Sequence, residues 1–282
     1  MKKHSIKKRK SAKSMLIKGF LRSFFIVAIL LGAAVAGYQA TLKIWAVEGN
    51  KDPIMVTATP SPEPITTPSV DDISKNLIYC YDKEDNRISR ILLEIFNCDE
   101  RQLAYITIPI STKLTMSDTL YRKLKVIRPE IPQIIRLSAI TKYLSEDTVF
   151  DYGVLMVEDL LGTKLSYYTV IPEDLFTEMF EEQEQPIPTQ VFTKAYTEKI
   201  GKLNTEEEIN AYLEEIYPRI SSNLSLQDKL NYVESYLRTP IDRVIFMRLA
   251  GEELNSGFEM DTLKAALQIH ELSASKPSAA NK

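Results

Sequence analysis

An apolar segment near the N-terminus is long enough to cross a membrane, and it constrains the rest of the chain. Residues 23–42 contain no charged side chain, and about twenty such residues span the roughly 30 Å hydrocarbon core as a helix. Residues 1–22 hold nine Lys and Arg and no Asp or Glu. Because basic flanks stay in the cytoplasm, the sequence predicts a single-pass protein of the cell membrane with a cytoplasmic N-terminus and an extracytoplasmic C-terminal domain.

A cleaved secretory signal is the alternative interpretation of the same segment. Ala34-Val35-Ala36 has the small-x-small form that signal peptidases prefer. The apolar stretch is longer than the roughly 7 to 15 residues of a signal h-region, which favours an uncleaved anchor. Both interpretations export the remainder of the chain.

The part of the chain after the basic tail is acidic. It holds 26 basic and 38 acidic residues, a formal charge near −12, which excludes nucleic acid as an expected partner. Cys80 and Cys98 lie in this part, where a disulfide is chemically permitted. A hairpin turning near Asp85-Asn86 would place Cys80 opposite about residue 91 and Cys98 roughly 23 Å away. We therefore expect two unpaired cysteines.

Composition divides the chain into five parts. Five prolines among Thr and Ser follow the apolar segment and are typical of an extended linker. The last residues are small and polar. The predicted parts are a basic cytoplasmic tail (1–22), a transmembrane helix (23–42), a tether (43–72), a globular domain (73–272) and a flexible tail (273–282).

Within the globular domain, strand and helix patterns alternate. Alternating β-rich runs between turn residues predict strands, and apolar spacing of three and four predicts helices. A mixed sheet with helices on its faces, an α/β domain, is the expected result. The predicted strands are 76–81, 88–96, 103–109, 165–171 and 243–249. The predicted helices are one around 131–138, one over 150–161 ended by Gly162, a short one from 172, one after a Thr205–Glu208 capping box and one over 225–237, with an acidic loop at 181–190.

The residue types limit the chemistry that the domain can perform. Its histidine content is one residue, His270, because His4 falls in the cytoplasmic tail, so no histidine pair can hold a metal or build a triad. The sequence contains no G-x-S-x-G, P-loop or Cys-x-x-Cys motif. A basic group could bind phosphate or form a solvated helix face; its members are Arg122, Lys123, Lys125, Arg128 and Arg136.

Three segments together resemble the LytR-CpsA-Psr family. In chain order they are residues 88–93 (Ile-Ser-Arg-Ile-Leu-Leu), 107–112 (Thr-Ile-Pro-Ile-Ser-Thr) and 157–168 (Val-Glu-Asp-Leu-Leu-Gly-Thr-Lys-Leu-Ser-Tyr-Tyr). The predicted anchor and Pro-rich tether are also similar. The resemblance implies an α/β/α sandwich and extracytoplasmic transfer of glycopolymers from a polyprenyl-pyrophosphate carrier to peptidoglycan. Members of the family use Mg²⁺, acidic residues and pyrophosphate-binding arginines.

The resemblance also shows which functional groups this chain lacks. The family's R-S-D-T motif places its arginine at Arg87 and its aspartate at Ser89, and the S-I-P-R-D-T motif places its arginine at Ile110 and its aspartate at Ser111. A later arginine-rich motif should lie between Phe180 and Thr205, a stretch without arginine. A serine hydroxyl supplies neither a hard anionic ligand for Mg²⁺ nor a strong base.

Three interpretations stay open. The first is a non-catalytic relative without catalytic residues or cofactor, which contacts the membrane and binds a polyprenyl-phosphate lipid, a cell-wall polymer or other envelope proteins; its candidate substrate contacts are Arg87, Arg122 and Arg128. The second is an active phosphotransferase that holds Mg²⁺ through the displaced carboxylates Glu94, Asp118 or Asp151. The third is an unrelated membrane-anchored interaction domain with chance motif matches.

Overall fold

The structure, a computed structural model, describes residues 65–69, 71–180 and 199–274. The predicted basic tail, the transmembrane helix with its alternative as a signal peptide, most of the tether, the acidic loop at 181–190 and residues 275–282 lie outside these ranges. Within these ranges no helix combines the length and apolar character needed to cross a bilayer.

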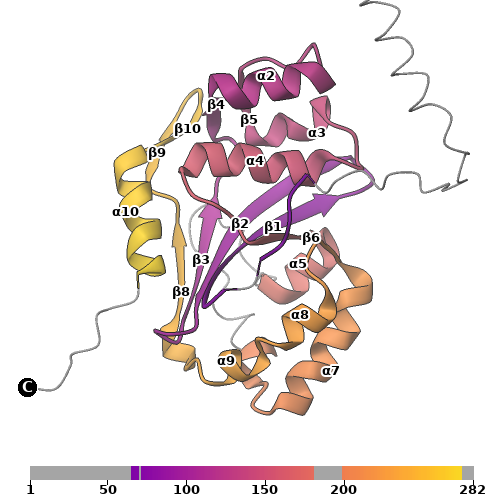
Figure 1. Cartoon of the computed structure of the whole chain (residues 1–282), viewed down its shortest axis with the longest axis vertical. Coiled ribbons are helices and arrows are strands. Elements are labelled where there is room, and N and C mark those ends of the chain that lie inside the picture. Colours follow the sequence, from indigo (N-terminus) through magenta and orange to yellow (C-terminus); the bar gives the residue numbers. More distant parts are fainter. Residues whose placement is uncertain (1–64, 70, 181–198, 275–282) are drawn as a thin grey trace, which may run out of the picture. The chain divides into compact units, whose positions relative to one another are not determined.

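A six-stranded mixed sheet forms the centre of the domain (Figure 1). Its strand order is β7-β6-β1-β2-β3-β8. Neighbours β1–β2, β2–β3 and β6–β7 are antiparallel, whereas β6 runs parallel to β1 and β8 parallel to β3. The predicted mixed sheet is confirmed. The bounds are β1 Ile73–Asp82, β2 Arg87–Asn97, β3 Gln102–Ile108, β6 Tyr167–Pro172, β7 Ser221–Ser222 and β8 Val244–Arg248.

The turn between β1 and β2 explains why the first hairpin forms where it does. An Asp82 carboxylate oxygen accepts hydrogen bonds from the backbone N–H groups of Glu84 and Asp85 at 3.0 and 3.2 Å. Asn86 closes the turn with a φ of 48°, a left-handed conformation that asparagine tolerates better than most residues. Cys80 pairs with Arg90 across the hairpin, close to the expected register. No disulfide joins Cys80 to Cys98.

Helices cover both faces of the sheet, as Figure 1 shows. One face carries α2 (Asp118–Ile127), the 3-10 turn η1 (Leu137–Ala139), α3 (Ile140–Tyr143), α4 (Val149–Leu161) and α10 (Thr262–Ser273). The other carries α5 (Glu173–Phe180), η2 (Ile200–Lys202), α7 (Glu206–Ile216), η3 (Tyr217–Arg219), α8 (Leu226–Leu230), α9 (Val233–Leu237) and η4 (Ile241–Arg243).

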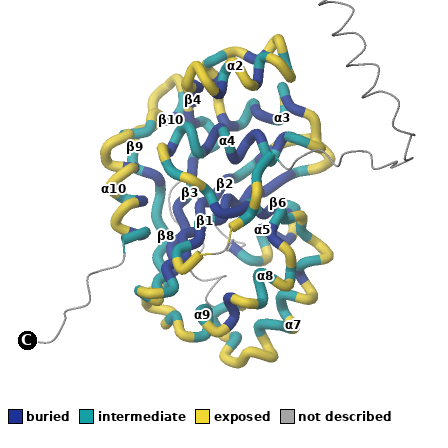
Figure 2. Tube along the Cα trace, viewed as in Figure 1, coloured by how far each residue is buried: buried dark blue, intermediate teal, exposed yellow. Residues whose placement is uncertain are grey.

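The central strands are buried along most of their length (Figure 2), and their side chains alternate between two cores. Odd-numbered residues of β1, and of β2 from Ile91 onward, such as Tyr79 and Leu93, pack toward α2, α3 and α4. Even-numbered residues, such as Leu92 and Phe96, pack toward α5 and α7. A strand whose two faces are both buried under helices requires such a near-continuous run of apolar residues. Glu94 lies between Leu92 and Phe96 and interrupts the second core with a charge.

Two helix-end signals in the sequence are confirmed. The Thr205 side chain accepts a hydrogen bond from the Glu208 N–H at 3.2 Å, and Glu208 accepts one from the Thr205 N–H at 3.2 Å, which completes the capping box. Gly162 follows α4 with a φ of 64°, the left-handed conformation that glycine adopts without a Cβ penalty.

The predicted helix around residues 131–138 is wrong. Ile134–Arg136 forms strand β5, which pairs with β4 (Lys113–Thr115) as a separate small sheet. Ile134 is 57% exposed and Ile135 is 5% exposed, the alternation of a strand. Apolar residues at positions 131, 134 and 135 fit a helix equally well, so periodicity over so short a run does not separate the two.

Other boundaries also differ from the sequence prediction. The expected helix over 225–237 breaks into α8 and α9 at Asn231 and Tyr232. The hairpin of β9 (Gly251–Leu254) and β10 (Gly257–Met260) and helix α10 were not predicted, and α10 extends to Ser273. Residues 65–69, which belong to the predicted tether, contact the domain, since Thr66 donates to Asp151 at 2.6 Å.

Candidate functional site

The positions that correspond to the family motifs meet at one edge of the sheet. Ile91 pairs with Ile108 in the antiparallel β2–β3 ladder, so the start of β2 and the end of β3 share this edge. Ser89 lies near the start of β2, and Ile110 and Ser111 follow the end of β3. We call these three residues the motif edge.

The side chains at the β2 end of the motif edge are engaged within their own hairpin. Ser89 donates through Oγ to Cys80 Sγ at 3.1 Å. Arg87 forms ion pairs with Asp82 at 3.5 Å and Asp85 at 3.9 Å. These pairs hold the exposed Arg87 against the β1–β2 turn. Arg87 therefore serves as a turn residue in this structure.

The β3 end of the motif edge is packed against other segments. Ile110 packs on the first core, and its carbonyl accepts from the Ser138 N–H at 2.8 Å. A Cβ added at Gly257 would lie 2.6 Å from the Ser111 carbonyl oxygen, so the β9–β10 hairpin approaches Ser111 closely. Neither residue carries a charge that could hold a metal or a phosphate.

The predicted basic group occupies three different settings. Arg122 bonds through Nε to the Asp118 carbonyl of its own helix at 3.1 Å, and Arg128 is the C-cap of α2. Arg136 bonds to the Ser256 carbonyl in the β9–β10 turn at 2.9 Å. Arg87, Arg122 and Arg128 share no partner.

The carboxylates proposed as displaced metal ligands are also held separately. Asp118 accepts from Gln133 Nε2 at 3.1 Å, and Asp151 accepts from Thr66 at 2.6 Å and Tyr168 at 3.4 Å. Glu94 is buried on the other face of the sheet. In residues 65–69, 71–180 and 199–274, no group of three or more His, Cys, Asp or Glu side chains could hold a metal. Asp118, Asp151 and Glu94 share no hydrogen-bond partner, so the structure does not bring these three carboxylates together as one set of ligands.

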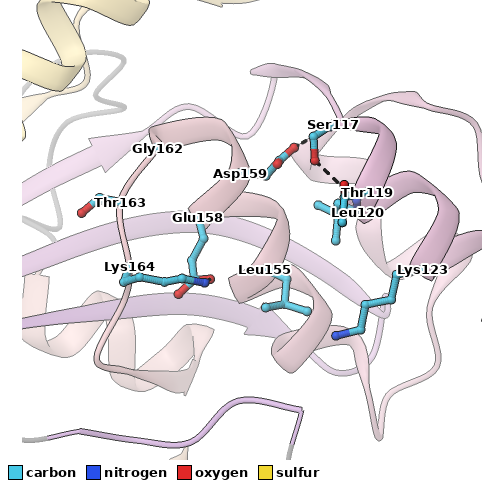
Figure 3. Close-up of a pocket in the computed structure, with 10 residues that line it drawn as sticks. All are labelled: Ser117, Thr119, Leu120, Lys123, Leu155, Glu158, Asp159, Gly162, Thr163 and Lys164. Atoms are coloured by element: carbon cyan, nitrogen blue, oxygen red, sulfur yellow. Dashed lines mark hydrogen bonds and ion pairs between the residues drawn. The ribbon is translucent and has the colours of Figure 1, made fainter.

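A first recess, of about 350 Å³, lies between α2 and the C-terminal end of α4 (Figure 3). Its carboxylates already have structural partners. Asp159 accepts from the Ser117 N–H at 2.7 Å at the start of α2, and Glu158 pairs with Lys164 at 2.6 Å and accepts from the Leu165 N–H at 3.0 Å. These contacts fix the ends of two helices, so we assign the recess a structural role.

A second cavity, of about 380 Å³, lies between the sheet and the helices α5, α7 and α9. Its size is near the lower end of the range for small-molecule sites, about 300 to 1,000 Å³. Most of its wall is apolar, including Leu103, Met179, Ile209, Leu213 and Leu237. Glu94, Lys229 and Tyr236 introduce polar atoms into that wall. We call this space the Glu94 cavity.

Lys229 organises the polar wall of the Glu94 cavity. Its Nζ donates to the hydroxyls of Tyr236 and Tyr167 at 2.7 and 2.8 Å and lies 3.4 Å from Glu94 Oε1. The ammonium lies 5.0 and 5.3 Å from the centroids of the two tyrosine rings, beside the hydroxyl-bearing edges that it contacts. We call Glu94, Lys229, Tyr167 and Tyr236 the Glu94–Lys229 cluster.

Burial keeps the tyrosines of this region protonated. Burial raises the pKa of Tyr167 well above its ordinary value near 10, and the Glu94 carboxylate raises it further. Burial likewise raises the pKa of Tyr212, which lines the cavity. The hydroxyls of Tyr167 and Tyr212 are therefore neutral at physiological pH.

The sequence identified one member of this cluster and missed its partners. Glu94 was singled out as a displaced metal ligand, whereas the structure gives it a lysine partner 135 positions away. The available signal was a glutamate inside the apolar run Ile91–Phe96, because a buried carboxylate needs a compensating group. Nothing in the sequence identifies Lys229 as that group. Tyr167 lies in the predicted strand 165–171, and its hydroxyl accepts a hydrogen bond from Lys229.

Comparison with known proteins gives a fold and no close relative. No protein-family model matches the sequence, and no curated protein matches it. Bacillus subtilis TagV shares 12% identity over 74% of this chain and 100% of its own length, with a TM-score of 0.50. Streptococcus agalactiae protein gbs0355 shares 12% identity over 74% of this chain and 91% of its own, with a TM-score of 0.51. The chain shares its fold with these proteins.

Proposed function

We propose that this chain is a membrane-anchored extracytoplasmic protein with a LytR-CpsA-Psr-type domain that does not catalyse phosphotransfer. It serves as a lipid-binding or partner module in the attachment of cell-wall glycopolymers or in envelope regulation. TagV, whose fold it shares, is a LytR-CpsA-Psr protein, and this favours the family over an unrelated interaction domain. Identity of 12% leaves the activity to be argued from the residues.

The motif edge carries the proposal. Transfer from a pyrophosphate develops negative charge that cations must neutralise, and Mg²⁺ must be held by carboxylate oxygens. Ser89 bonds to Cys80, Ile110 packs in the core and Ser111 lies under the β9–β10 hairpin. Each missing charge removes a few kcal/mol of transition-state stabilisation, and together such losses are close to abolishing turnover.

Membrane anchoring in this proposal rests on the sequence. The uncharged residues 23–42 and the nine cations before them support a helix with its N-terminus in the cytoplasm. An anchor would keep the domain beside the lipid carriers of the membrane surface. Envelope lipids, wall polymers and envelope proteins are then the accessible partners.

A transfer assay tests the absence of catalysis. The full-length chain in nanodiscs is mixed with a polyprenyl-pyrophosphate-linked glycopolymer, peptidoglycan and Mg²⁺, and polymer attached to peptidoglycan is measured. We expect no product above protein-free nanodiscs. Mg²⁺-dependent attachment that disappears in Asp118→Asn or Asp151→Asn, with Asp147→Asn as an exposed control, would support the active enzyme instead.

A further inference from the structure

Glu94 has unused acceptor capacity inside the Glu94 cavity. All four hydrogen bonds to its carboxylate reach Oε1, at 3.4 to 3.5 Å from Asn76, Tyr167, Lys229 and Tyr236. These are long compared with the usual 2.7 to 3.2 Å for N–H donors and 2.5 to 3.0 Å for O–H donors. Among the described residues, none donates a hydrogen bond to Oε2. A buried carboxylate in this state lacks compensation for the water it has lost.

The second oxygen of Glu94 is reachable from the cavity. In the described part of the chain, the side-chain oxygens that are buried without any partner are Asn210 Oδ1 and Ser273 Oγ. Glu94 Oε2 is not among them although it has no hydrogen bond, so a water-sized molecule can touch it. Because Glu94 is only 5% exposed and lines the cavity, we infer that this access is through the cavity.

The ammonium of Lys229 and the two tyrosine hydroxyls already form hydrogen bonds within the cluster. Lys229 directs its three ammonium hydrogens to Tyr236, Tyr167 and Glu94. Both hydroxyls accept from Lys229 and donate to Glu94 Oε1. An anionic head group would therefore find no unused donor in the cluster and would lie beside a carboxylate. A cationic head group would add an uncompensated charge to a pair whose charges cancel.

We infer that the Glu94 cavity binds an uncharged amphiphile whose hydroxyl donates a hydrogen bond to Glu94 Oε2 while its alkyl chain lies against Leu213 and Leu237. Burial of the alkyl chain against the apolar wall removes it from water and so contributes favourable free energy of binding. The charged acceptor supplies selectivity for a donor head group. The inference deepens the proposed function, on which it rests for the membrane setting, by naming the class of lipid.

Site-resolved photolabelling tests the inference on the full-length chain in nanodiscs. Three photoreactive probes share one ten-carbon diazirine chain and end as an alcohol, a phosphate monoester or an alkane. Peptide mapping separates labels in the cavity from labels that reflect partition into the bilayer. We expect the alcohol to label the α7 and α9 peptides about tenfold more than either other probe, the selectivity of one charge-assisted hydrogen bond.

Two variants make the result specific. Leu213→Trp should fill the cavity and abolish labelling of the α9 peptide, whereas Leu263→Trp, on the exposed face of α10, should leave it unchanged. The double variant Glu94→Leu with Lys229→Met removes both charges and should label equally with alcohol and alkane. Thermal unfolding of each variant confirms that the domain is folded.

Several outcomes would overturn the inference. These are equal labelling of the wild type by alcohol and alkane, stronger labelling by the phosphate, or unchanged labelling of Leu213→Trp. Polymer transfer in the assay described above would instead contradict the proposed function and leave the labelling result intact. The two failures are therefore distinguishable.

Discussion

The Glu94–Lys229 pair should show a large energetic coupling, which a double-mutant cycle measures. Lys229→Met leaves a carboxylate that is 93% buried with long bonds from neutral donors, and should cost about 3 kcal/mol of unfolding free energy. Glu94→Gln leaves Lys229 with two short hydrogen bonds to tyrosine hydroxyls, and should cost about 2 kcal/mol. The double variant retains no unpaired charge and should also cost about 2 kcal/mol, which makes the coupling about 3 kcal/mol.

Urea unfolding of the full-length chain in detergent micelles, followed by far-ultraviolet circular dichroism, gives the four free energies. The matched control is Lys83→Met with Glu146→Gln, an ion pair of 3.8 Å whose side chains are 82% and 58% exposed. Its coupling should stay below about 1 kcal/mol. A Glu94–Lys229 coupling no larger than that of the control would refute the reasoning, because the buried charges would then not depend on each other.

Three further predictions concern other parts of the domain. Gly153→Ala would place a Cβ 2.6 Å from the Tyr79 hydroxyl and should cost about 1 kcal/mol in urea unfolding despite the better helix propensity of alanine; in a Tyr79→Phe background the same change should become stabilising. Burial and Asp151 raise the pKa of Tyr168 to about 12, so near pH 10 the unfolded chain releases this proton while the folded chain retains it. The free energy of unfolding should therefore fall between pH 10 and 12, and it should fall less steeply in Tyr168→Phe. Circular dichroism at each pH measures it. Combined Arg122→Glu and Arg128→Glu should change pyrophosphate affinity less than about threefold in calorimetry, because six positions along α2 turn the two side chains to different sides; a tenfold loss would make them phosphate ligands.

The sequence predicted those parts of the fold whose signals are local. The β1–β2 turn, the Thr205 capping box and the Gly162 helix end each depend on a few adjacent residues with definite backbone preferences. The short strand β5 was mistaken for a helix because its identity is set by pairing with β4, about twenty residues earlier. Pairing of this kind is a tertiary property.

The candidate site was less predictable than the fold for the same reason. The motif edge could be located because a resemblance supplied the positions of Ser89, Ile110 and Ser111, but their contacts could not. The Glu94 cavity depends on the meeting of β2 with α7 and α9, and its lysine is 135 positions from its glutamate. The apolar neighbours of Glu94 in the sequence indicate that it is buried, but they do not identify Lys229 as its partner.

The buried pair is a costly way to fill the second core, and that cost bears on its role. Leucine at position 94 together with methionine at position 229 would continue the apolar side of β2 between Leu92 and Phe96 and would remove the desolvation of two charges. Replacing buried ion pairs by apolar residues is often neutral or stabilising, by about 1 to 4 kcal/mol. Stability alone therefore gives no reason for a glutamate at this position. An acceptor oxygen exposed to an apolar cavity gives one, because it selects a ligand with a donor among lipids that the cavity would otherwise bind alike.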